Sequence, residues 1–249
     1  MHNDLFSIGL LTVHGYGLMI GLGIVAALLL SWHRAKKKDW SQDTVTTLAI
    51  IALIFGFLGA KLLYIFAHFS EFKAAPVVTL GSEGFAVAGG LILGTAAVLF
   101  YCHRKKLASL GWTDLLLPGV ALAQGLGRIG CHLAGCCFGK PTDAWWGVVF
   151  PIGSGAPAGI SLWPVQLISA AALILLSALL LHLEKRSSIQ KEGTITALYL
   201  LLYGAGRFAV EYLRNDPRGF VGFLSTSQFI SLFMIAAGLI LLSIRKRKA

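Results

Sequence analysis

Apolar residues occur in seven runs of about 20 residues, separated by charged or Gly/Pro-containing connectors. A helical run of this length matches the hydrocarbon thickness of a bilayer. Helix is the expected state because an open sheet would leave backbone groups without hydrogen bonds in lipid. We therefore predict an all-α, polytopic integral membrane protein with one transmembrane domain over residues 1–249. Its predicted helices lie near residues 10–32, 44–68, 83–103, 113–134, 163–183, 194–213 and 226–244, with boundaries accurate to about 2–4 residues.

Lysine and arginine alternate across the predicted helices and set their orientation. The connectors after the first, third and fifth helices and the C-terminal tail share 14 of them: Arg34, Lys36, Lys37, Lys38, Arg104, Lys105, Lys106, Lys185, Arg186, Lys191, Arg245, Lys246, Arg247 and Lys248. The opposite side has only Lys73, Lys140, Arg214 and Arg218. Because positive residues favour the cytoplasmic side, the pattern predicts seven helices, an outward N-terminus and a cytoplasmic C-terminus.

Composition supports a membrane protein and argues against a nucleic-acid-binding protein. The chain is 56% hydrophobic and 13% charged, whereas a soluble domain has about 25% charged residues. The net charge of +10 is accounted for by topology and anionic lipid, so no nucleic acid is expected as a partner. The first residues, MHNDLFS, lack the positive stretch of a signal peptide, so we expect the first apolar run to stay in the mature protein.

Three cations, Lys61, Arg128 and Arg207, fall inside predicted helices, and Glu211 is the matching buried anion. A charge at the bilayer centre costs about 2.5–3.5 kcal/mol on insertion scales, so such residues usually face a cavity or each other. The alternative is an ion pair that serves packing alone.

The stretch 124–139, QGLGRIGCHLAGCCFG, combines glycines with one arginine, one histidine and three cysteines. If it is helical throughout, Arg128, Cys131, His132 and Gly135 share one face, which Cys136 continues. An arginine fork suits a phosphate bidentately, and a phospholipid headgroup is the natural phosphate for a membrane protein.

A second constellation lies in residues 199–214, YLLLYGAGRFAVEYLR. Tyr203, Arg207, Glu211 and Arg214 again share one helical face, and the Arg207–Glu211 spacing suits an intrahelical ion pair. Glu211 is expected to hold Arg207 in place for a phosphate, or to act as a base. The alternative is a solvated end of the sixth helix.

The chain resembles the prolipoprotein diacylglyceryl transferase family over nearly its whole length. The matching motifs are, in order, HGYGLM at 14–19, GAKLLY at 59–64, AGGLILG at 88–94, GRIGCHLAGCCFG at 127–139, WPVQL at 163–167, GRFAVEYLR at 206–214 and STSQFIS at 225–231. The resemblance implies seven helices with an outward N-terminus. Together with the spacing arguments it places Tyr16, Lys61, Gly89, Gly90, Gly139, Gln166 and Tyr203 at the substrate site.

Several positions depart from the family pattern. Lys61 replaces an arginine, and Ala88 stands where the family has a histidine. The two asparagines and the glutamate of the family's G-R-I-G motif are replaced by Cys131, Ala134 and Cys136, and Val165 replaces a serine. Arg128, Arg207 and Glu211 are retained.

The resemblance implies transfer of diacylglyceryl from phosphatidylglycerol to a lipobox cysteine of a prolipoprotein signal peptide, in the bacterial cytoplasmic (inner) membrane. Arg128 and Arg207 would stabilise phosphate charge, and Glu211 or His132 would take the thiol proton. We expect the protein to need no cofactor and to be a monomer surrounded by membrane lipids.

The cysteines leave alternatives open. Cys131 or Cys136 could act as a nucleophile near an arginine. Cys131, Cys136 and Cys137 could instead serve thiol-redox or soft-metal handling, although their spacing is no standard zinc pattern. They could also pack as small apolar residues in a non-catalytic, phospholipid-binding relative.

Overall fold

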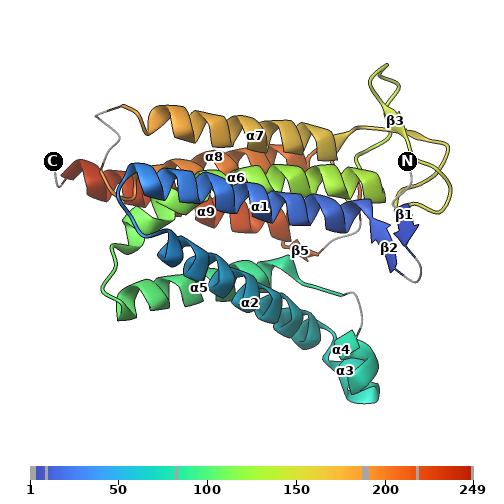
Figure 1. Ribbon diagram of the computed structural model, residues 1–249. Coiled ribbons are helices and arrows are strands. Elements are labelled where there is room, and N and C mark those ends of the chain that lie inside the picture. Colours follow the sequence, from blue (N-terminus) through green and yellow to red (C-terminus); the bar gives the residue numbers. More distant parts are fainter. Residues whose placement is uncertain (1–3, 9–10, 82–83, 187–190, 217–218, 248–249) are drawn as a thin grey trace. The chain divides into compact units, whose positions relative to one another are not determined.

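The computed structural model describes residues 4–8, 11–81, 84–186, 191–216 and 219–247 (Figure 1). The chain forms two compact units, Met1–Ser31 with Thr113–Ala249, and Trp32–Trp112, each of which is considered by itself. The long helices are α1 Gly15–Lys37, α2 Gln42–Ala67, α5 Val87–Arg104, α6 Ser109–Ala134, α7 Val165–Leu183, α8 Thr194–Glu211 and α9 Thr226–Arg247. The short helices are α3 Phe69–Ala74 and α4 Pro76–Gly81.

Three antiparallel pairs of short strands complete the described elements. They are β1 Asp4–Ile8 with β2 Leu11–His14, β3 Val148–Val149 with β4 Ser161–Leu162, and β5 Phe220–Val221 with β6 Leu224–Ser225. The first pair corrects the predicted helix start at residue 10, because the structure begins α1 only at Gly15. The β-branched pair Thr12 and Val13 favours the extended backbone of β2.

The helical prediction is confirmed, and each of the seven predicted runs overlaps one long helix. Within the described residues, four helices are long and apolar enough to cross a membrane: Gly15–Lys37, Gln42–Ala67, Val165–Leu183 and Thr226–Ile244. Two other long helices, α6 and α8, contain ionisable side chains, which lower their hydropathy. Arg218 and Lys248 of the predicted charge pattern lie outside the described residues.

A buried carboxylate joins α6 to the start of α8. Asp114 accepts hydrogen bonds from the backbone N–H groups of Gly193 and Thr196, both at 2.6 Å, and from the Thr196 hydroxyl at 2.6 Å. The first backbone N–H groups of a helix have no partner within the helix, and its N-terminus favours negative charge. Asp114 therefore caps α8 from a different helix and fixes the position of α8 beside α6.

In the second unit, α2 and α5 meet at glycines. A Cβ atom on Gly59 would overlap the carbonyl oxygen of Gly89, and a Cβ on Gly89 would overlap that of Gly59. Small residues at such a contact let two helix backbones approach closely. The packing of α2 on α5 therefore depends on both residues remaining glycine.

Candidate functional site

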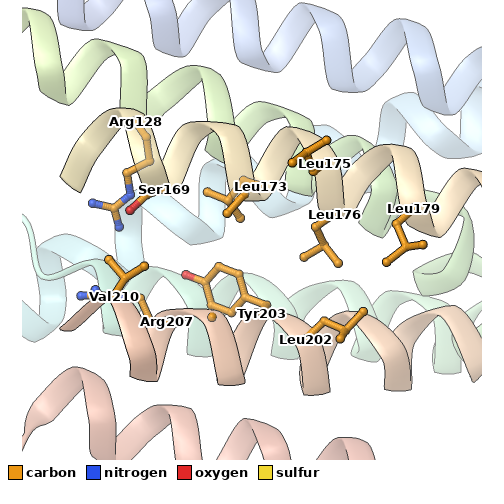
Figure 2. Close-up of a pocket in the computed structure, with 12 residues that line it drawn as sticks. Arg128, Ser169, Leu173, Leu175, Leu176, Leu179, Leu202, Tyr203, Arg207 and Val210 are labelled. Atoms are coloured by element: carbon orange, nitrogen blue, oxygen red, sulfur yellow. The ribbon is translucent and has the colours of Figure 1, made fainter. Parts of the chain in front are cut away.

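A cavity of about 530 Å³ opens in the first unit between α6, α7 and α8 (Figure 2). Its lining residues are Arg128, Ser169, Ala172, Leu173, Leu175, Leu176, Leu179, Leu202, Tyr203, Gly206, Arg207 and Val210. Three residues predicted from spacing and motifs, Arg128, Tyr203 and Arg207, thus reach one cavity from two different helices.

The polar end of the cavity is built around two arginines. Arg207 forms an ion pair with Glu211 at 2.9 Å and donates a hydrogen bond to the Ser227 hydroxyl at 2.7 Å. The predicted intrahelical pair is therefore present, and its side chains are 17% and 4% exposed. Arg128 and Arg214 lie within electrostatic range of Arg207. This excess of guanidinium groups over carboxylates suits an anion with several oxygen atoms.

The other end of the cavity is apolar. Figure 2 shows Leu176, Leu179 and Leu202 toward one end, and the Arg128 guanidinium with Ser169 at the other. An elongated cavity with cations at one end and leucines along its walls fits a lipid, whose headgroup is anionic and whose acyl chains are apolar. Such a shape does not suit a small, fully polar substrate.

Tyr203 stands between the two ends of the cavity and is held by a second tyrosine. The rings of Tyr199 and Tyr203 stack with centroids 5.4 Å apart. Tyr199 is buried and donates a hydrogen bond from its hydroxyl to Gln124 Oε1 at 2.9 Å. The contact from Gln124 of α6 thus sets the position of the Tyr203 ring on α8.

Cys131, Cys136 and Cys137 lie together where α6 ends, at a turn that the sequence pattern did not predict. The predicted helical face from Arg128 to Cys136 is wrong at its end, because α6 stops at Ala134 and Gly135 adopts a left-handed φ of +69°. The Cys136 N–H then bonds the Cys131 carbonyl at 3.1 Å, and the Gly135 N–H bonds the His132 carbonyl at 3.2 Å. These two bonds form a Schellman motif, which brings Cys131 and Cys136 against each other.

The sulfur atoms of Cys131, Cys136 and Cys137 all lie within 4.8 Å of one another, and each residue is partly buried. Hydrogen bonding from the Cys131 thiol, and then from Cys136, lowers the pKa of the Cys137 thiol. The nearby guanidinium groups of Arg214 and Arg128 act in the same direction. The thiolate is the reactive and metal-binding form of cysteine.

Other predicted residues support this end of α6. Gln166 is buried and donates from Nε2 to the Cys136 carbonyl at 2.8 Å. Gly139 pairs with Arg214 in a β-bridge just beyond α8, which ends at Glu211. Arg214 itself holds Asp216 through two hydrogen bonds, at 3.0 and 2.8 Å. In this way the backbone after the cysteines is tied to the C-terminal end of α8.

His132 and Tyr16 are two further predicted residues near the C-terminal end of α6. His132 is buried, and its ring packs edge-to-face against Phe150 with centroids 5.6 Å apart. Tyr16 is 42% exposed, and its backbone packs against Gly130. Its hydroxyl is within electrostatic range of the cysteine sulfurs and Arg128. Neither residue lines the cavity.

Lys61, Gly89 and Gly90 belong to the second unit. Lys61 donates a hydrogen bond to the Gly84 carbonyl at 3.4 Å, and its ammonium lies 5.0 Å from the Phe85 ring centre. Gly89 and Gly90 face the α2 backbone at close range. Helix packing accounts for both glycines, and their role at a substrate site stays a prediction.

The sequence did not reveal that α7 lines the cavity. Ser169 and the leucines of α7 line the cavity, yet no functional role was assigned to them. A signal was available, since Ser169, Leu173 and Leu176 recur at the spacing of one helical face. The sequence does not reveal which helix that face meets.

Comparison with known proteins agrees with the geometry. A family model described as prolipoprotein diacylglyceryl transferase matches residues 3–244. The chain is similar to a phosphatidylglycerol–prolipoprotein diacylglyceryl transferase of Clostridium tetani, with 45% identity over 96% of each chain. A second relative of that name, from Clostridium perfringens, is 41% identical over 96% of this chain and 93% of its own. A third relative of that name, from Dehalococcoides mccartyi, is 33% identical over 98% of this chain and 93% of its own. The resemblance inferred from the motifs is thereby confirmed, and the chain belongs to the prolipoprotein diacylglyceryl transferase family.

Proposed function

We propose that this protein transfers the diacylglyceryl group of phosphatidylglycerol to a cysteine thiol of a prolipoprotein. The observation that carries the proposal is the cavity, with Arg128 and Arg207 at one end and leucines along its walls. The names of its relatives give both substrates. In this assignment the two arginines bind the lipid phosphate, and the leucines of α7 and α8 contact the acyl chains.

The reaction is a displacement at carbon. The acceptor thiolate attacks the glyceryl carbon that bears the phosphate, a C–S bond forms and the C–O bond to phosphate breaks. Glycerol phosphate leaves with the bonding electron pair. Negative charge grows on the phosphate oxygens as this bond breaks, and guanidinium groups aimed at these oxygens stabilise the transition state more than the ground state.

Glu211 has two candidate roles in this scheme. Its ion pair holds Arg207 in the orientation seen in the cavity. It is also, with His132, a candidate acceptor for the thiol proton. Cys131 and Cys136 lie outside the cavity lining, and direct transfer needs no covalent step on either; a nucleophilic role for them stays a prediction.

The proposal includes the finer topology that the sequence predicts. All seven long helices cross the bacterial cytoplasmic membrane, the N-terminus faces outward, and the chain works as a monomer. The acceptor cysteine is that of a lipobox in a signal peptide. Two observations support this topology. The seven long helices overlap the seven apolar runs, and the connectors between these runs are alternately rich and poor in lysine and arginine.

A reconstituted transfer assay tests the proposal. Purified protein is incubated with phosphatidylglycerol and a lipobox peptide, and the thioether-linked lipopeptide is measured by mass spectrometry. Arg128→Ala is compared with Arg186→Ala, which removes an equal charge from an exposed position after α7. We expect product from the wild type and Arg186→Ala, and a loss of at least about 100-fold with Arg128→Ala. No product from folded wild-type protein, or full activity of Arg128→Ala, would overturn the proposal.

A further inference from the structure

The three-cysteine cluster at the end of α6 is not needed for the reaction above. Cys131, Cys136 and Cys137 present three sulfur atoms within 4.8 Å of one another, while the fourth cysteine, Cys102, is buried in the other unit. Thiolate sulfur is the ligand type preferred by soft metal ions.

The backbone holds the three sulfur atoms together before any ligand arrives. The Schellman turn at Gly135 sets Cys131 against Cys136, and the Cys136 thiol donates to the Cys131 carbonyl at 3.7 Å. Cys137 follows with a positive φ of 58°, which a non-glycine residue rarely adopts. Local strain of this kind costs of order 1–3 kcal/mol and is found mainly where function requires a particular geometry.

Neighbouring groups fix this turn from two sides. Gln166 of α7 bonds the Cys136 carbonyl at 2.8 Å. The N–H of Gly155, in the loop before α7, bonds the Ala134 carbonyl at 3.5 Å. Sites that bind metal tightly have ligands held by such a second layer of contacts.

We propose that Cys131, Cys136 and Cys137 bind one soft divalent metal ion through their three sulfur atoms. A zinc–sulfur bond of about 2.3 Å places tetrahedral ligands about 3.8 Å apart. The sulfur atoms, none further than 4.8 Å from another, need to close by about 1 Å at most to reach this separation. A fourth position remains for water or an added ligand, as in metal sites that are not purely structural.

Charge and proton balance are consistent with this site. Each thiol that coordinates the ion releases its proton to solvent, so no oxidant or reductant is required. Three thiolates and a divalent ion carry a net charge of −1. Arg128 and Arg214 act electrostatically on this cluster and offset that charge.

Cadmium titration of the reduced, detergent-solubilised full chain tests the site. Cadmium is the probe because thiolate–cadmium bonds give an ultraviolet charge-transfer band. We expect one ion per chain in the wild type and in Cys102→Ser, which keeps the cluster and removes the remaining cysteine. Cys131→Ser and Cys137→Ser should each lose the band or bind at least tenfold more weakly. Added zinc should displace the cadmium.

A second measurement uses the wild-type protein alone and does not depend on the folding of variants. Cadmium-loaded and metal-free samples are alkylated, and the modified cysteines are identified by peptide mass spectrometry. Protection of Cys131, Cys136 and Cys137 together supports the site. Alkylation at equal rates in both samples, or an unchanged band in Cys131→Ser, would overturn it. Because both readouts are independent of lipid transfer, failure of the metal site and failure of the proposed reaction are distinguishable.

Discussion

Two replacements at Arg207 separate its structural role from its proposed role in lipid transfer. In Arg207→Ala, Glu211 loses the 2.9 Å ion pair and Ser227 loses its 2.7 Å hydrogen bond. The Glu211 side chain is only 4% exposed, so the variant removes an ion pair from a largely dehydrated carboxylate. Removing one partner of a buried pair costs about 3–5 kcal/mol in the free energy of unfolding. We expect Arg207→Ala to lower the melting temperature clearly.

The double variant Arg207→Met/Glu211→Gln removes both charges while keeping similar shapes. Neutral replacements of a buried pair are often tolerated, so the double variant should recover most of the lost stability. It should not recover transfer, because the guanidinium proposed to bind the phosphate is still missing. Removing one such donor typically lowers kcat by about 100- to 1000-fold.

The assay combines melting in detergent with steady-state kinetics on phosphatidylglycerol and the lipobox peptide. Arg186→Ala serves as the charge control, because it lies at an exposed position away from the cavity lining. If the double variant regains both stability and transfer to within tenfold of the wild type, Arg207 is a packing residue and the reasoning fails.

Three further changes probe other parts of the chain. Asp114→Ala removes three hydrogen bonds at the start of α8 and should destabilise the protein by about 2 kcal/mol, seen as a lower melting temperature. Gly59→Ala places a Cβ against the backbone of α5 and should cost about 1–3 kcal/mol. The same change at Gly21, where nothing lies within 4 Å, should be neutral; equal melting of the two variants would contradict the packing. Leu202→Trp reduces the apolar end of the cavity and should raise KM for long-chain phosphatidylglycerol about tenfold, whereas equal KM values for long- and short-chain lipid would show that the acyl chains lie elsewhere.

Much of the helical arrangement was predictable because a long apolar run is a simple physical signal. Runs of about 20 apolar residues placed all seven long helices, and spacing alone paired Arg207 with Glu211. The start of α1 was missed because Leu11–His14 is apolar enough to extend the run, although its β-branched residues favour a strand.

The candidate site was predicted only within single helices. Arg128 and Arg207 were singled out because buried charge is costly, and the structure brings both to one cavity. Ser169 and the leucines of α7 were missed because a helical face does not reveal its partner. Cys131 and Cys136 were predicted to share a face if the helix continued to residue 136, whereas the left-handed Gly135 ends the helix and creates the cluster.

The cap that Asp114 places on α8 has a consequence for synthesis in the membrane. Asp114 precedes Gly193 by 79 residues, so α6 leaves the ribosome well before α8. In the proposed topology, α8 enters lipid with Arg207 and Glu211 and has little tendency to remain there alone. An acceptor already in place on α6 gives the new helix a partner for its unpaired N–H groups. Because α6 precedes α8 along the chain, the carboxylate of Asp114 is present before α8, whose N-terminus it caps, is made.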